Sequence, residues 1–208
     1  WEGRRPATEV REWEGYFTSA GYNTLMVDGS TPAIWGEHPL RQGEGLRDAA
    51  WHLDADVDWA WGTHPAGFDA APDVRWQRGL LFAKGGYWLV IDRILGPGTH
   101  DFSLRWLLTP AATEIEADGL TVHTVNPDAN VRLVPVVPAG ARLDVWSGNR
   151  DPLRGWFSPE NGTMIPAPQL EYRWHGTAQI LTAMLIVPYR DQPPTHRLAM
   201  RSQADDTH

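Results

Sequence analysis

The clearest pattern of apolar and polar positions lies in Asp73–Pro110, where three apolar stretches are separated by glycine-rich breaks. It predicts one strand over Val74–Lys84 and a second over Tyr87–Ile94, joined at Gly85-Gly86, because glycine reaches positive φ without a Cβ clash. A Gly-Pro-Gly break then precedes a third strand over Asp101–Leu108. Its strict alternation of apolar and polar residues is typical of an antiparallel sheet that buries one face against a second layer.

Shorter apolar stretches with turn signals between them recur along the rest of the chain, and none shows the helical period of about 3.6 residues. Two long loops are expected at residues 30–50 and 147–168, and strand pairs at 113–125 and 131–146. The pattern therefore predicts an all-β fold of about ten to twelve strands, as a sandwich or a barrel. The further expected strands are Asn23–Val27, Trp51–Trp61, Thr113–Ala117, Leu120–Val125, Val131–Val137, Ala141–Trp146, Leu170–Trp174 and Thr177–Pro188.

The predicted strand Trp51–Trp61 has an acidic polar face, which carries His52, Asp54, Asp56 and Asp58. These residue types bind metal ions in many proteins. However, same-face neighbours on a strand lie about 6.6 Å apart, too far for one ion to gather them at about 2.3–2.6 Å. We therefore interpret this face as a solvated strand face and predict no metal site on it.

Composition narrows the classes of function. The 208 residues carry a formal net charge of −8 and their basic residues are scattered, which argues against nucleic-acid binding. The absence of cysteine excludes disulfides and thiolate chemistry. No apolar run approaches the roughly 20 residues that a membrane-spanning helix needs. The 12 tryptophans are many for this length, and β-proteins that handle sugars use tryptophan rings as stacking platforms.

The common catalytic signatures are absent from the chain. It has no phosphate-binding glycine loop, no nucleophile elbow and no His-Glu-x-x-His motif. Residues 1–15 are polar and irregular and the chain opens on Trp1, so we expect a processed or excised segment. One domain is expected over residues 16–190, followed by a polar tail at residues 191–208.

Four segments, in order along the chain, resemble one known family. They are YFTSAGYNTLMVDG at residues 16–29, THPAGF at 63–68, the three-strand set at 74–110, and RGWFSPENGTMIPAP at 154–168. Each is similar to a segment of the C-terminal β-sandwich of the heparinase II/III-like polysaccharide lyases. The resemblance implies that the all-β fold is an antiparallel β-sandwich.

The resemblance also implies an enzyme that cleaves uronic-acid-containing polysaccharide by β-elimination. In this reaction the uronate carboxylate is neutralised, a base removes the C5 proton, the C4–O bond breaks to leave an unsaturated uronate, and an acid protonates the leaving oxygen. In the family, most of the groups that do this lie on an N-terminal α-helical toroid, which is outside this chain. The chain is therefore expected to form one wall of the substrate cleft, to pack against the toroid and to be inactive alone. The expected setting is bacterial, and periplasmic or secreted.

Candidate site residues follow from the same resemblance. Tyr22 and His64 are catalytic candidates, because phenol and imidazole groups can transfer protons. Asn23 is a candidate hydrogen-bond donor to sugar, and Trp76, where the family tends to carry histidine, is a candidate sugar platform. Arg78 matches a family arginine, and if it points inward it must pair with a carboxylate or with substrate. An ordinary structural role stays open for each of these five residues.

Tyr22 stands where the family carries a histidine that helps to hold a structural zinc, so neither a metal nor another cofactor is expected. The alternative to a lyase domain is a non-catalytic carbohydrate-binding or interaction domain of the same ancestry, since a fold does not fix a function. A purely structural scaffold domain is a third reading. The polysaccharide itself stays open between heparan-type, alginate-type and other uronates.

Overall fold

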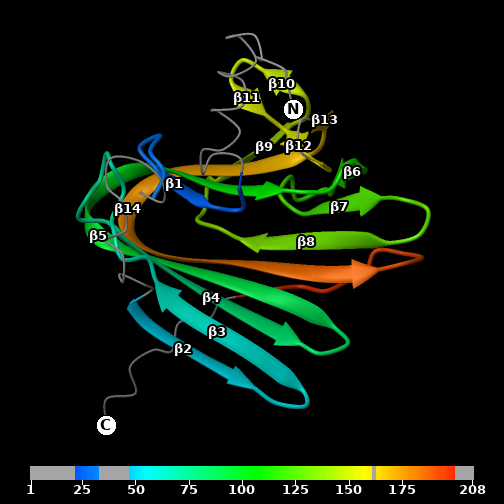
Figure 1. The fold of residues 1–208 in the computed structure, drawn as a ribbon, viewed down its shortest axis with the longest axis horizontal. Coiled ribbons are helices and arrows are strands. Elements are labelled where there is room, and N and C mark those ends of the chain that lie inside the picture. The colour runs from blue at the N-terminus through cyan, green and yellow to red at the C-terminus, as the bar shows by residue number, and fades with distance from the viewer. Residues whose placement is uncertain (1–21, 33–46, 161–162, 200–208) are drawn as a thin grey trace, which may run out of the picture.

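The structure, a computed structural model, describes residues 22–32, 47–160 and 163–199. These ranges contain strands and turns but no helix, which confirms the predicted all-β, antiparallel sandwich. Consequently, no helix that could cross a membrane is found in them. The strands form one large sheet and two small ones, and the large sheet folds over on itself (Figure 1).

The large sheet has ten strands in the order β2-β3-β4-β5-β14-β8-β7-β6, with β1 paired to β5 and β9 paired to β14. Its strands are β1 (Leu25–Val27), β2 (Arg47–Leu53), β3 (Val57–Thr63), β4 (Arg75–Ala83), β5 (Tyr87–Leu107), β6 (Ala112–Ile115), β7 (Val122–Val125), β8 (Asn130–Val136), β9 (Arg142–Trp146) and β14 (Gln169–Tyr189). The two small sheets are β10 (Asn149–Arg150) with β11 (Leu153–Arg154), and β12 (Trp156–Phe157) with β13 (Ile165–Pro166). They lie within the predicted long loop at 147–168.

The two longest strands, β5 and β14, each contribute to both layers of the sandwich. They pair antiparallel along almost their whole length, with a register shift between Thr177 and Gln179. The first half of β5 and the second half of β14 lie beside β4 and β8, whereas their other halves lie beside β1 and β9. Both strands curve at the left of Figure 1, where the chain passes from one layer to the other. One strand pair therefore ties the two layers together.

Two predicted strand ends are wrong, because both long strands continue through their glycines. At Gly96 an added Cβ would lie 2.9 Å from the Cα of Val74, so this glycine permits a close approach of two backbones. Gly98 adopts a φ of +83°, which lets the chain bend before its pairing with β14 resumes at Thr99. In β14 the bend lies beside Gly176. Each pair of predicted strands is thus one long bent strand.

The predicted strand Trp51–Trp61 is instead a hairpin of β2 and β3. Its turn is closed by Asp54, whose Oδ1 accepts two backbone N–H groups of the following residues at 2.8 and 2.7 Å. An aspartate that closes a turn in this way needs no glycine or proline beside it. Trp51 pairs with Ala60 across the hairpin, so Trp51 and Trp59 face opposite sides of the sheet and not one common side.

The predicted pair of strands at 131–146 also separates. β8 pairs with the second half of β14 and β9 pairs with its first half, so the turn at Ala139-Gly140 carries the chain from one layer to the other. The predicted hairpin of β6 and β7 is confirmed. The chain therefore uses β14 as the partner of both segments, which local turn signals do not reveal.

The main core fills the space between the two layers. It draws on both halves of β5 and β14 and on the strands beside them, and its members at most 2 % exposed include Leu25, Ile94, Phe102, Leu104, Leu133, Leu170 and Tyr172. A smaller cluster of Val134, Leu185 and Val187 lies on the opposite face of β8 and β14, where Leu198 packs against it. The face of β4 that looks toward the main core carries the candidate site.

Candidate functional site

The candidate site is built on the inner face of β4, the face turned toward the second layer. Alternate residues of a strand point to the same face, so Trp76 and Arg78 lie next to each other there. The sheet register places Asp92 of β5 directly opposite Arg78. Asp92 is only 1 % exposed although it carries a carboxylate. A buried carboxylate of this kind requires hydrogen-bond donors around it.

Asp92 accepts three side-chain hydrogen bonds. Arg78 donates Nε–H to Oδ1 at 2.7 Å and Nη2–H to Oδ2 at 2.9 Å, and Trp76 donates its indole N–H to Oδ1 at 2.6 Å. The guanidinium carbon also lies 4.7 Å from the ring centre of Trp76 and 5.5 Å from that of Trp106. The inward-pointing Arg78 is thus paired with a carboxylate, one of the two partners that the sequence allowed.

A third hydrogen bond of Arg78 reaches the segment before β1. Its Nη1 donates to the backbone oxygen of Asn23 at 2.7 Å. The side-chain oxygen of Asn23 accepts the backbone N–H of Leu107, at the end of β5, at 2.7 Å. Asn23 therefore accepts the backbone N–H at the end of β5 with its side chain and is held by Arg78 through its own backbone oxygen. The neighbouring Tyr22 is 51 % exposed, so its phenol is presented to solvent and is not packed in the core.

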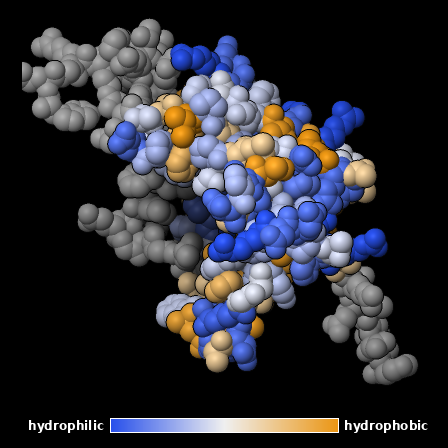
Figure 2. Space-filling view, turned by 90° about the vertical axis from the view of Figure 1, so that its right-hand side faces the viewer, coloured by the Kyte–Doolittle hydropathy of each residue, from blue (hydrophilic) through white to orange (hydrophobic). Residues whose placement is uncertain are grey.

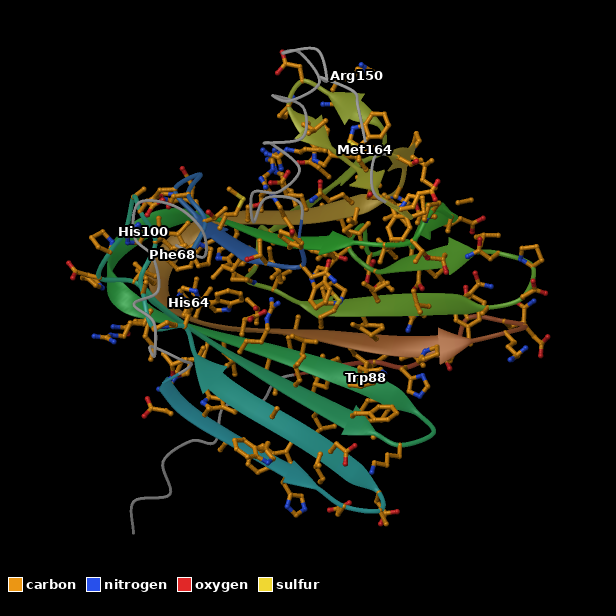
Figure 3. The ribbon with its side chains drawn as sticks, viewed as in Figure 1. His64, Phe68, Trp88, His100, Arg150 and Met164 are labelled. Atoms are coloured by element: carbon orange, nitrogen blue, oxygen red, sulfur yellow. The ribbon has the colours of Figure 1, made fainter. Side chains whose placement is uncertain are left out.

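His64 lies just after β3, near the bend of the long strands (Figure 3). Its ring stacks on Trp76, with 6.2 Å between ring centroids and 22° between ring planes. Nδ1 lies 2.8 Å from the backbone oxygen of Ala66, and this contact favours the tautomer with its proton on Nδ1. Nε2 then keeps its lone pair, which is the form that accepts a proton from another molecule.

The structure brings four of the five predicted residues into direct contact, in the order His64, Trp76, Arg78 and Asn23, with Tyr22 as the chain neighbour of Asn23. The group offers a phenol, an imidazole, a guanidinium and an aromatic face at one place. Sequence reasoning missed two further members, Asp92 and Trp106. The available signal for Asp92 was a carboxylate at an inward position of a strand that is otherwise apolar on that face.

A second buried ion-pair network lies on the outer face of the other layer. Glu171 of β14 accepts hydrogen bonds from Arg105 at 2.7 Å, Ser103 at 2.5 Å and Trp146 at 3.0 Å, and Arg154 lies 2.8 Å away. Burial by itself raises the pKa of Glu171, but these hydrogen bonds and positive charges outweigh it and lower the pKa to about 2. Since Arg154 belongs to β11, this network fastens the small β10–β11 sheet to β14.

His100 forms a third polar cluster at the bend. Its Nδ1 lies 2.6 Å from Oδ2 of Asp28 and its Nε2 lies 2.9 Å from the backbone oxygen of Pro97. Because both ring nitrogens face acceptors, the doubly protonated ring is favoured, and the hydrogen bond to Asp28 raises the pKa of His100. The same bond lowers the pKa of Asp28. This cluster joins β1 to β5 and has a structural explanation.

Among the described residues of the candidate site, His64 supplies the imidazole and Asp92 the carboxylate, and that carboxylate is already bonded to Arg78 and Trp76. Within the described ranges, no group of three or more histidines and carboxylates is arranged to hold a metal. Tyr22 presents an exposed phenol at the position where the resemblance expects a histidine. The backbone oxygen of Asn23, the residue after Tyr22, already accepts a hydrogen bond from Arg78.

Exposed apolar side chains continue the inner face of the sheet toward the free ends of its hairpins. Trp51 and Leu53 are 72 % and 70 % exposed, and Leu80 and Trp88 are 42 % exposed each. Phe82 stacks on Trp88 with 4.0 Å between ring centroids. Trp88 lies well away from His64 along the sheet (Figure 3). On the side of the molecule that carries the free hairpin ends, hydrophobic residues form separate patches within a mostly hydrophilic surface (Figure 2).

Comparison with known proteins gave a family match over nearly the whole chain. The family profile described as "Heparinase II/III-like, C-terminal" matches residues 3–200. The search of curated proteins found no match.

Solved structures with the same fold include several heparinases. Heparan sulfate lyase HepC from Pedobacter heparinus is similar over 93 % of the chain, with a TM-score of 0.72 and 19 % identity. The heparinase III-BT4657 gene product gives 0.63 and 14 % over 91 %, and a structure called heparinase III gives 0.64 and 11 % over 90 %. The chain covers 28 %, 26 % and 26 % of these proteins, respectively, or about a quarter of their length.

Proposed function

Because the chain belongs to the heparinase II/III-like family, as its C-terminal domain, we propose that it is part of a polysaccharide lyase that cleaves uronic-acid-containing polysaccharide by β-elimination. The domain forms one wall of the substrate cleft and is inactive by itself. The other wall and most of the catalytic groups belong to an α-helical toroid of the same parent protein. Neither a metal nor another cofactor takes part in the role of this domain.

The observation that carries this proposal is the convergence of the residues around Arg78. Arg78, Trp76 and His64 stack in sequence, and Arg78 is bonded to the segment that presents Tyr22. An acidic sugar needs a hydrogen-bonding clamp for its carboxylate or sulfate and an apolar surface for its ring. A guanidinium beside an aromatic ring supplies both.

The proposed chemistry assigns one task to each group. Arg78 offers N–H donors to the acidic group of a uronate, which eases removal of the C5 proton. Trp76 packs against the main core and is contacted by His64 and Arg78, and its remaining exposed part contacts the sugar ring. Tyr22 and His64 stand at the rim as proton-transfer groups, because the phenol is exposed and the favoured tautomer of His64 leaves Nε2 free to accept a proton. The setting proposed for this reaction is the periplasm or the exterior of a bacterial cell.

The test is lyase activity of the complete protein that carries this domain. Heparan sulfate, alginate and other uronate polymers are incubated with it, and formation of unsaturated uronate is followed by ultraviolet absorbance. We expect activity in the complete protein, none in residues 1–208 alone, and reduced kcat in the Tyr22→Phe variant with unchanged folding. No activity of the complete protein on any polymer would contradict a lyase.

A second candidate function is a non-catalytic carbohydrate-binding or interaction domain. The charge of Arg78 is already offset by Asp92, so its attraction for an anion is weaker than that of a free arginine. The exposed Trp51 and Trp88 would serve a binding surface as well as a cleft wall. This candidate predicts glycan binding by residues 1–208 without cleavage by the complete protein.

A further inference from the structure

Asp92 is the least exposed member of the candidate site, with 1 % of its surface exposed. It is nevertheless bonded to both residues that would contact a sugar, through the guanidinium of Arg78 and the indole N–H of Trp76. Since the carboxylate lies on β5 and both donors lie on β4, one buried group fixes two neighbouring side chains of the inner face at once.

The hydrogen bonds that Arg78 makes within the protein determine how many of its N–H donors remain for a ligand. A guanidinium has five N–H donors in a rigid plane. Three are used inside the protein, by the two oxygens of Asp92 and by the backbone oxygen of Asn23. The remaining two, one on each terminal nitrogen, have no partner among the described residues. With the side chain 20 % exposed, they are the donors that a carboxylate or sulfate can reach.

The same contacts restrict the orientation of the guanidinium. Asp92 fixes one edge of the fork, Asn23 fixes the next donor, and the rings of Trp76 and Trp106 lie within 4.7 and 5.5 Å. Rotation of the plane would break at least two hydrogen bonds, so the two remaining N–H groups point in a set direction. Pre-set donors of this kind lose little freedom when a ligand binds.

We propose that Asp92 is a positioning residue, which aims the two remaining N–H groups of Arg78 at the acidic group of a uronate and holds Trp76 in place as the platform beside it. This inference rests on the proposed function and adds to it the residue that sets the geometry. Through Asn23, the same arginine also holds the segment that presents Tyr22, so the position of the phenol depends on Asp92 as well.

The test compares two matched variants in the complete protein. Asp92→Asn removes the charge of a buried carboxylate that accepts from an arginine and a tryptophan. Glu171→Gln does the same on the outer face of the other layer, where the buried carboxylate also accepts from one arginine and one tryptophan, Arg105 and Trp146. Both variants are checked for folding by circular dichroism and thermal unfolding, and their kcat and KM are measured on the best uronate polymer.

We expect kcat/KM of Asp92→Asn to fall by about tenfold or more, mainly through KM. Arg78 would no longer be held in place by Asp92, so its charge-assisted hydrogen bond to the acidic group of the substrate would be lost. Glu171→Gln should lose as much stability or more and keep kcat/KM within about twofold. In an Arg78→Gln background, Asp92→Asn should have little further effect on KM, since it acts through that arginine. Equal kinetics for the two single variants, or additive effects with Arg78→Gln, would overturn the inference.

A second variant covers the case in which Asp92→Asn does not fold. Arg78→Lys keeps the positive charge and an ion pair with Asp92 but cannot serve both Asp92 and Asn23 as a planar fork. It should raise KM by about tenfold as well, and wild-type kinetics of this variant would overturn the inference. If the complete protein neither cleaves nor binds any uronate polymer, both the proposed function and this inference are wrong. If it cleaves a uronate polymer and the variants at Asp92 and Arg78 keep wild-type kinetics, only the inference is wrong.

Discussion

Replacing Glu171 by glutamine tests the energetics of the sandwich most sharply. Glu171 is 3 % exposed and holds Arg105, which is also 3 % exposed. The pKa of Glu171 is about 2 in the folded protein against 4.5 in an unfolded chain, and this difference corresponds to roughly 3 kcal/mol of stability. Removing one partner of a buried ion pair costs about 3–5 kcal/mol by itself, so the two routes agree.

The pH dependence of the stability provides a second test of the same prediction. A folded pKa below the unfolded one means that the contribution of Glu171 is fully present above about pH 4.5 and is lost as the pH falls toward 2. Glu171→Gln should therefore be roughly 3 kcal/mol less stable than the wild type at pH 7, and the two proteins should converge toward pH 2.

The assay is urea unfolding of residues 1–208 followed by tryptophan fluorescence, at pH 7 and about pH 3. The matched control is Arg173→Gln, because Arg173 of the same strand pairs with Asp144 but its side chain is 55 % exposed. That variant should lose less than about 1 kcal/mol. A loss below about 1 kcal/mol for Glu171→Gln at pH 7, or a loss that does not shrink at low pH, would refute the reasoning.

Two further variants test the bend and its histidine. His100→Gln should abolish a pH-dependent part of the stability that is present below pH 6.5 and lost as the pH rises through the raised pKa of His100, because only the charged ring donates to both Asp28 and Pro97; parallel stability-pH curves for the two proteins would speak against it. Gly96→Ala should lower stability by about 1–3 kcal/mol, since the added Cβ would lie 2.9 Å from Val74 Cα, and a thermal midpoint equal to that of the wild type would show that the bend relaxes without cost.

The strand content was predictable because apolar alternation and turn residues are local signals. The β4–β5 hairpin at Gly85-Gly86 and the β6–β7 hairpin are where the pattern places them. Local signals failed where one strand serves two layers. A Gly-Pro-Gly sequence ends many strands, but β5 pairs with β14 on both sides of this segment, whose three residues themselves have no partner in the register.

The candidate site was predictable only in its residues, not in its connections. Family resemblance pointed to Arg78 and Asn23, which are 55 residues apart in sequence, and a strand pattern cannot show that they are bonded. The role of Asp92 depends on the register between β4 and β5, which pairs it with Arg78. Likewise, the turn at Asp54 was missed because it uses a side-chain oxygen in place of glycine.

The most direct test of the central claim is formation of unsaturated uronate by the complete protein, compared with residues 1–208 alone, on the same panel of uronate polymers. A lyase whose cleft wall is this domain predicts product from the complete protein and none from the isolated chain. Absence of product from the complete protein on every polymer, together with glycan binding by the isolated chain, would contradict the lyase and favour a carbohydrate-binding domain.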